Sequence, residues 1–170
     1  MATNCTITSR KLLKYLYQFK SVELDLSIDG VGKVNEYIRY GHSWKTIEKN
    51  LKKWSFLSTV IPDFKIRIFS TIQAYNIHDI KNIKNLSKKY NISSTCNILN
   101  GPKFLNINVL PEEYINRIKD EYNSHILSIY KNDRKSWPDF VEYTNKLDSR
   151  TGITLKDVNP LLYSYFKNGL

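Results

Sequence analysis

One segment near the N-terminus alternates strictly between apolar and polar residues. The apolar set is Val22, Leu24, Leu26 and Ile28, the polar set is Glu23, Asp25, Ser27 and Asp29, and Gly30 follows. A period of two places successive side chains on opposite faces of a β-strand, so a strand is predicted from Val22 to Gly30. An antiparallel strand with one wet face fits the same pattern. A hairpin partner would follow within a few residues, however, and a long helical pattern follows instead.

The rest of the chain alternates between helical and extended patterns. Helices are predicted at Ser9 to Phe19, Ser43 to Trp54, Asn76 to Tyr90, Pro111 through Ile129 and Trp137 to Leu147, with a short final segment from Asp157 to Phe166. Extended segments are predicted at Phe64 to Gln73, Thr95 to Leu99 and Phe104 to Val109. Helices that separate strands favour an α/β fold with a largely parallel sheet and right-handed crossovers.

The chain has the size of one ordinary domain, with 170 residues of which 41% are hydrophobic. No apolar run approaches the ~18 residues of a membrane span. The first residues lack a signal-peptide pattern, so a cytoplasmic location without a membrane partner is expected. Cys5 and Cys96 are far apart and form no ligand motif, so neither a disulfide framework nor a metal site of this chain alone is expected. His42, His78 and His125 are expected to be structural or solvent-facing.

The net charge of +10 comes from 26 basic and 16 acidic residues and permits binding to nucleic acid or another anion. Nearly all of the basic residues are lysines spread along the chain. Lys, Asn, Ile and Tyr are all abundant, as happens when the coding DNA is rich in A and T. The sequence carries no helix-turn-helix, RNA-recognition or zinc signature. A nucleic-acid partner is therefore the less favoured interpretation of the charge.

Polar residues occur at the end of each predicted strand. They are Ser27 and Asp29, then Thr71, Gln73 and Asn76, then Asn97 and Asn100. Ligand sites of parallel sheets lie at the carboxyl ends of the strands, so one common site is expected. Gly30 and Gly32 let the chain fold back over a ligand. Arg39 suits a carboxylate or phosphate, which a guanidinium holds through two bonds, although an isolated arginine is more often a surface residue.

These residues resemble a known family. Ser27-Ile28-Asp29-Gly30, followed by Arg39, resembles the fourth strand of radical S-adenosylmethionine (SAM) enzymes. With Trp44 to Asn50 behind it, the segment is most similar to twitch domain-containing radical SAM proteins. Other segments that resemble parts of those proteins are Thr71 to Ile77, Pro102 to Pro111, Phe140 to Leu147 and Lys156 to Pro160. The likeness covers nearly the whole chain.

The resemblance implies a partial (β/α) barrel. Residues 1–130 would form about three strand–helix units, and residues 131–170 would be a C-terminal helical extension packed on them. Thr3-Asn4-Cys5 resembles the Thr-Asn-Gly end of that family's third strand, so the chain would begin there and lack the first half of the barrel. In the family, that half carries the Cys-x-x-x-Cys-x-x-Cys loop that binds a [4Fe–4S] cluster.

The resemblance also implies part of a SAM site without catalytic residues of its own. Ser27 would hydrogen-bond the SAM ribose or its surroundings, Asp29 would shape the strand end, and Arg39 would pair with the SAM carboxylate. Gln73 and Asn76 would line the cofactor or substrate side. The [4Fe–4S] cluster would be present only if a missing N-terminal half or a partner chain supplied it.

Three functions stay open at this stage. The first is a radical SAM-type fragment that is inactive alone and acts with a partner chain that completes the barrel. The second is a binding or interaction module without chemistry, because an open sheet edge before Ser9 would invite association. The third is a basic nucleic-acid-binding protein.

Overall fold

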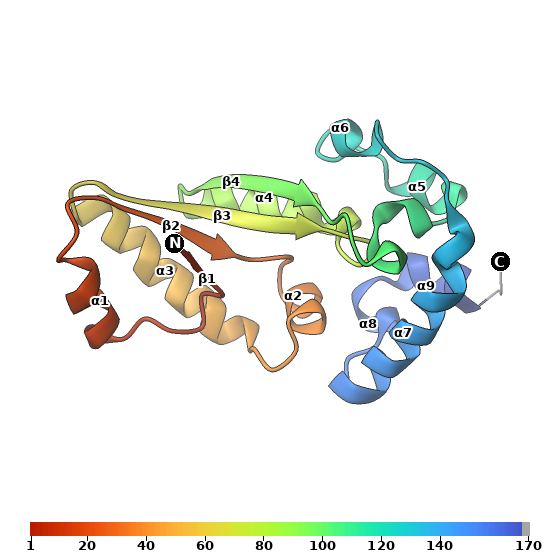
Figure 1. The fold of residues 1–170 in the computed structure, drawn as a ribbon, viewed down its shortest axis with the longest axis horizontal. Helices are drawn as coiled ribbons and strands as arrows, with labels where there is room; N and C mark the ends of the chain where they lie inside the picture. The colour runs from red at the N-terminus through yellow and green to blue at the C-terminus, as the bar shows by residue number, and fades with distance from the viewer. Residues whose placement is uncertain (168–170) are drawn as a thin grey trace.

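The structure is a computed structural model that describes residues 1–167. In Figure 1, the sheet and the helices that cover it form one end of the molecule, and a helical unit forms the other end. The strands are β1 (Ala2–Thr3), β2 (Val22–Ser27), β3 (Phe64–Ile72) and β4 (Ser93–Ile98). The helices among them are α1 (Arg10–Leu16), α2 (Lys33–Ile38), α3 (Trp44–Val60) and α4 (Ile80–Lys89), with the 3₁₀ turn η1 (Ile77–Asp79) before α4.

All four strands are parallel, and they are adjacent in the order β1-β2-β3-β4. The register between β2 and β3 runs from Val22 opposite Phe64 to Ser27 opposite Phe69. A strand order that follows the chain, with a helix in each connection, confirms the predicted α/β class with a parallel sheet. Part of a (β/α) barrel has this strand order, and so does an open sheet.

The helices α1, α3 and α4 cover one face of the sheet (Figure 1). The apolar positions of the alternating pattern point into this layer, and Leu24, Leu26 and Ile28 are at most 1% exposed. Their partners in α3 include Ile47, Leu51 and Trp54. Full burial of each such side chain stabilises the fold by about 1.5–3 kcal/mol. This layer is therefore the main core of the sheet part.

The opposite face of the sheet is exposed or half-buried along its length. It consists of Glu23, Asp25 and Ser27 of β2, Lys65, Arg67, Phe69 and Thr71 of β3, and Ser93, Thr95 and Asn97 of β4. We call this surface the open sheet face. All-parallel sheets are normally covered on both faces. The wet face that the alternating pattern indicated is therefore present, although the strand that carries it is parallel.

The helical unit packs at the carboxyl ends of the strands. It contains η2 (Lys103–Leu105), η3 (Ile107–Val109), α5 (Glu112–Ile118), α6 (Ser124–Leu127), η4 (Arg134–Ser136), α7 (Trp137–Thr151), α8 (Leu155–Val158) and α9 (Pro160–Lys167). Phe140 is fully buried, and its ring centroid lies 5.1 Å from that of Trp137 and 5.2 Å from that of Tyr75. One hydrophobic cluster contains side chains from α5, α6, α7 and α8. The domain boundary at residue 130 stays a prediction.

The segment from Phe104 to Val109 is not extended, contrary to the sequence prediction, but forms the turns η2 and η3. Asn106 separates these turns. Its Oδ1 accepts from the backbone N–H of Asn108 at 2.9 Å, and its Nδ2 donates to the carbonyl of Leu99. Local bonds of this kind from asparagine compete with extended structure.

The prediction of one helix from Pro111 through Ile129 is also wrong, because the chain breaks between α5 and α6. Asp120 and Asn123 cap each other there: the N–H of Asp120 donates to Asn123 Oδ1 at 2.9 Å, and the N–H of Asn123 donates to Asp120 Oδ1 at 3.1 Å. Ile129, expected on the buried stripe, is consequently 57% exposed.

The first helix is shorter than predicted, because α1 ends at Leu16. Phe19, expected on its inner stripe, lies beyond this end and is 65% exposed. No helix within residues 1–167 is long and apolar enough to cross a membrane. The cytoplasmic location stays a prediction.

His78 attaches the last helices to the start of α4. Its Nε2 donates to the carbonyl of Val158 at 3.2 Å, and its Nδ1 accepts from Asn159 Nδ2 at 3.1 Å. These partners require a neutral ring with the proton on Nε2. Burial lowers the pKa of His78 to about 4, more than the bond to Val158 raises it. The expected structural role of this histidine is confirmed.

This histidine makes stability dependent on pH. The unfolded chain takes up a proton at His78 near pH 6.5, whereas the folded chain resists protonation down to about pH 4. Stability should therefore fall as the pH drops through this window, by up to about 3 kcal/mol. The measurement is urea unfolding across the window. His78→Gln, which keeps a donor for Val158, should lose most of this dependence. His125→Gln, at an exposed position, should keep it, and equal pH profiles for the wild type and His78→Gln would contradict the assignment.

Candidate functional site

A buried carboxylate joins the ends of β2 and β3. Asp29 follows β2 and is 5% exposed. Its Oδ1 accepts from the backbone N–H of Thr71 at 2.8 Å. Its Oδ2 accepts from Arg39 Nε at 2.8 Å and lies 2.7 Å from Arg39 Nη2. Both carboxylate oxygens are therefore paired, as burial of a charge requires.

Two glycines shape the turn that returns Arg39 to Asp29. Gly32, the N-cap of α2, has a φ of +62°, a conformation in which other residues are strained. A Cβ atom added to Gly30 would lie 2.6 Å from Val34 Cγ1. The short helix α2 follows, and Arg39 stands at its C-terminal end. The fold-back that the glycines predicted therefore occurs, through a helix that the sequence pattern did not predict.

Two buried asparagines hold the backbone around this carboxylate. Asn35 Oδ1 accepts from the backbone N–H of Asp29 at 3.0 Å. Asn76 Nδ2 donates to the carbonyls of Asp29 at 2.7 Å and Thr71 at 2.9 Å, and its Oδ1 accepts from the N–H of Gln73 at 2.7 Å. Asn76 therefore clamps the two strand ends together. Its place beside a ligand stays a prediction.

Several side chains at this edge keep unused hydrogen-bonding groups. The hydroxyl of Ser27, on the open sheet face, bonds to no other residue in the range 1–167. Gln73 Oε1 and Asn35 Nδ2 are buried and have no partner among the described residues. The side chain of Arg39 is 26% exposed, and its Nη1 is not used by Asp29. Buried groups without partners are uncommon in native proteins and indicate places where water or a ligand binds.

A second buried carboxylate, which sequence analysis missed, supports the same loop. Asp79 is 2% exposed, and its Oδ2 accepts from the N–H of Val31 at 2.7 Å. Its Oδ1 accepts from Asn82 Nδ2 at 2.6 Å. Burial raises the pKa of Asp79 more than these two bonds lower it. Acidic residues are common near the start of a helix. The sequence therefore contains no sign that Asp79 is buried and bonded to the loop.

The third strand end contributes no hydrogen bond to Asp29 among the described residues. Asn97 is exposed on the open sheet face, where it stands opposite Thr71 in the register. Asn100 lines a separate polar hollow of about 190 Å³ whose other residues are Lys103, Asn106, Asn108, Asp133 and Ser136. No hydrogen bond among the described residues connects Asn97 or Asn100 with Asp29. Of the predicted site residues, the structure joins Asp29, Arg39 and Asn76 by hydrogen bonds, together with the backbone of Gln73. No hydrogen bond among the described residues joins the side chains of Ser27 and Gln73 to this group.

The described residues offer no metal site. Cys5 is 0% exposed, and burial raises the pKa of its thiol to about 12, so the thiol stays protonated. Cys96 is half-buried. Within residues 1–167, no group of three or more His, Cys, Asp or Glu residues could hold a metal ion. The chemistry at the strand ends is that of hydrogen-bonding groups around one guanidinium, which suits a polar or anionic ligand.

Comparisons of this chain with the known protein families, with curated proteins and with solved structures find no match. Inference about function therefore depends on the residues and their geometry.

The contacts of Asp29 predict that this residue is central to stability. Asp29→Asn should lower the free energy of unfolding by about 2–3 kcal/mol, because an amide N–H would face Arg39 and the charge pair would be lost. Asp25→Asn is the matched control. Asp25 pairs with Arg67 at 2.8 Å, but the side chains are 32% and 46% exposed, so its loss should cost less than about 1 kcal/mol. Urea unfolding of both variants measures the difference. Equal losses would show that Asp29 is not the central contact.

Proposed function

We propose that this chain is a half-barrel of the radical SAM type that binds the SAM carboxylate and ribose and acts with a partner. The observation that carries the proposal is the return of Arg39 onto the Asp29 carboxylate at the carboxyl end of β2, directly after the Ser27-Ile28-Asp29-Gly30 segment. The parallel pairing of Ala2 and Thr3 with Asp25 and Leu26 also supports it. This pairing agrees with an interpretation of β1 as a third-strand end and of β2 as the fourth strand.

The guanidinium of Arg39 fits a carboxylate ligand. Asp29 uses Nε and one N–H of Nη2, which leaves Nη1 and the second N–H of Nη2 as a second, end-on fork. A fork of this kind binds a carboxylate through two parallel bonds. Because Asp29 already orients the side chain, little rotamer entropy would be lost on binding.

The hydroxyl of Ser27, which bonds to no other residue in the part of the chain that the structure describes, adds a donor and an acceptor that suit a ribose hydroxyl. Gln73 adds an acceptor, Oε1, that lacks a partner among residues 1–167. When bound and reduced through an iron–sulfur cluster, SAM supplies a radical that abstracts hydrogen. The residues of this chain would hold the cofactor, and the cluster would need cysteines other than Cys5 and Cys96.

The open sheet face favours a second candidate function, that of an interaction module without chemistry. A parallel sheet with one uncovered face has room for another layer or for further strands that close a barrel. This candidate shares the partner with the first proposal but requires no SAM. Titration with SAM therefore separates the two.

Isothermal titration of the purified chain with SAM should give saturable binding. Arg39→Gln should weaken that binding by about 10- to 100-fold, because charge-assisted hydrogen bonds contribute about 1.5–3 kcal/mol. Ser27→Ala, which leaves the Asp29 contacts intact, should weaken it by about 2- to 10-fold. Arg67→Gln, on the same sheet but away from the strand ends, is the control and should bind like the wild type.

Absence of binding by the folded wild-type chain would overturn the SAM proposal and leave the interaction module. Equal affinity in the wild type and Ser27→Ala, together with unchanged affinity in folded Arg39→Gln, would show that SAM binds elsewhere. A chain that supplies the Cys-x-x-x-Cys-x-x-Cys half should form a brown complex with this protein under anaerobic, reducing conditions.

A further inference from the structure

The net positive charge of the protein is concentrated on the three helices that cover the sheet. Together α1, α3 and α4 contain eleven basic residues and one acidic residue, Glu48. Ten of these basic side chains are exposed. Glu48 is itself neutralised, because Lys89 Nζ lies 2.9 Å from its Oε1. We call this surface the basic helical face; its basic residues are Arg10, Lys11, Lys14, Lys45, Lys49, Lys52, Lys53, Lys81, Lys84, Lys88 and Lys89.

Coding bias alone does not explain this distribution. The helical unit, residues 103–167, comes from the same gene and contains ten basic and nine acidic residues. A bias toward lysine codons would act on both parts. The open sheet face is balanced as well, with Glu23 and Asp25 beside Lys65 and Arg67. The excess of positive charge therefore belongs to one side of the molecule, which the spread of lysines along the chain does not reveal.

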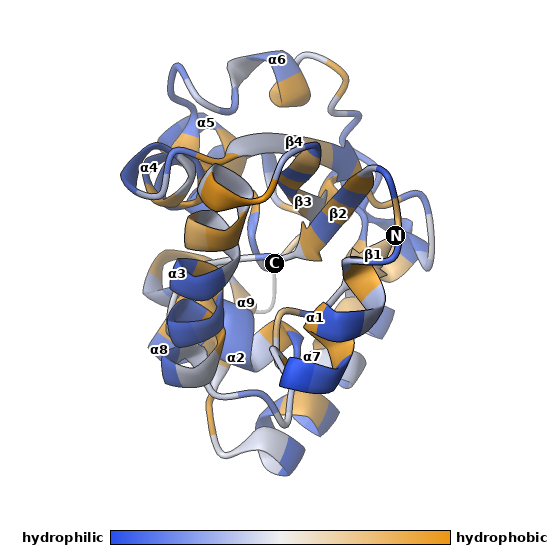
Figure 2. Cartoon of the chain, turned by 90° about the vertical axis from the view of Figure 1, so that its left-hand side faces the viewer, coloured by the Kyte–Doolittle hydropathy of each residue, from blue (hydrophilic) through white to orange (hydrophobic). Residues whose placement is uncertain are grey.

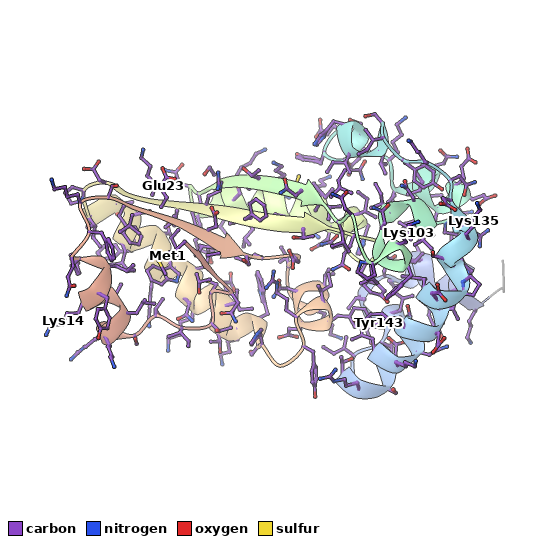
Figure 3. The ribbon with its side chains drawn as sticks, in the orientation of Figure 1. Met1, Lys14, Glu23, Lys103, Lys135 and Tyr143 are labelled. Atoms are coloured by element: carbon purple, nitrogen blue, oxygen red, sulfur yellow. The ribbon has the colours of Figure 1, made fainter. Side chains whose placement is uncertain are left out.

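The three helices form one continuous surface. Glu48 of α3 accepts from Lys89 of α4 and from the hydroxyl of Tyr90, each at 2.9 Å. On the other side, Lys53 of α3 donates to Thr8, just before α1, at 3.3 Å. Figure 2 shows blue, hydrophilic segments on α1, α3 and α4 at the end of the molecule opposite the helical unit. Figure 3 places Lys14 of α1 at this same end.

The surface suits a phosphate backbone better than a lipid bilayer. Interfacial helices insert an apolar face into the membrane. The apolar faces of α3 and α4 are already buried against the sheet, through Ile47, Leu51 and Trp54 and through Ile80, Ile83 and Leu86. The exposed large apolar side chains of the three helices are Tyr15, Phe56 and Val60, and the ten exposed basic side chains outnumber them. Lysine ammonium groups bind phosphates as point charges and release counterions.

We propose that the basic helical face binds nucleic acid through its phosphate backbone, without reading the base sequence. The inference does not depend on the SAM site, which lies at the strand ends and involves no residue of this face. Lysines without base-reading partners give affinity that depends steeply on salt.

The test compares two triple variants with the wild type. Lys45→Gln, Lys49→Gln and Lys52→Gln together remove three exposed charges from α3. Lys119→Gln, Lys131→Gln and Lys135→Gln remove three exposed charges from the helical unit, where Figure 3 places Lys135. Fluorescence anisotropy measures binding to a labelled DNA duplex and to a single strand from about 50 mM to about 200 mM salt. Circular dichroism confirms that both variants are folded.

The wild type should bind at low salt and lose about a thousandfold in affinity across this range if six phosphates are contacted. The α3 variant should bind at least about tenfold more weakly at low salt and reduce the salt slope by about 2–3. The helical-unit variant should change affinity by less than about threefold. Binding to either the duplex or the single strand supports the proposal, because both present the backbone.

Three results would overturn the proposal. Equal loss in the two variants would show that overall charge, and not the basic helical face, attracts DNA. Absence of DNA binding at the lowest salt would exclude nucleic acid as the ligand of the basic helical face. Binding to phosphatidylserine vesicles without binding to DNA at the same salt would identify an anionic lipid surface instead.

Discussion

The arrangement of the site depends on one constraint: the carboxylate of Asp29 is buried, and a buried charge has to be paired. Arg39 provides the pair, and its return holds α2 against the strand ends. Tyr37 on α2 then packs edge-on against Tyr75 and donates to Asp148 of α7 at 2.7 Å. One buried charge therefore links the end of the sheet to the helical unit. A change at Asp29 would reach both the candidate ligand groups and the packing between the two parts of the molecule.

A single period-two pattern produces both faces of the sheet, but helices cover one face and leave the other, the open sheet face, uncovered. The apolar face is closed by α1, α3 and α4, which together carry the excess of positive over negative charge. The polar face is open, and its central ion pair, Asp25 with Arg67, is accessible to water. Polar side chains let a parallel sheet remain stable with one face wet, although such sheets are normally covered twice. The same side chains would suit the interior of a closed barrel near a polar cofactor. The sheet therefore separates the basic helical face from the strand ends that carry the candidate site residues.

Much of the fold could be predicted from the sequence, because strict alternation and long helical stripes are strong signals. Short elements were less predictable. The helix α2 was missed because only six residues separate Gly32 from Arg39, too few to show a period. The break between α5 and α6 depends on capping by Asp120 and Asn123, which overrides an apolar stripe. At the candidate site, residue types at strand ends indicated Asp29, Arg39 and Asn76, which the structure joins by hydrogen bonds. The bonds of Asn35 could not be foreseen, because they depend on which backbone groups the strands leave unpaired.

The pairing of Arg39 with Asp29 does not prevent this arginine from binding a ligand. A guanidinium has five N–H donors in one plane, and Asp29 takes only one edge of that plane. The pair also lowers the net charge of the site to near zero, which weakens long-range attraction for any anion. Specificity would then come from direction, since a planar carboxylate can place one oxygen on each N–H of the remaining fork, in two parallel bonds. A ligand selected in this way needs further polar contacts for affinity. The hydroxyl of Ser27 and the Oε1 atom of Gln73, which have no hydrogen-bond partner among residues 1–167, are of the kind such a ligand would use.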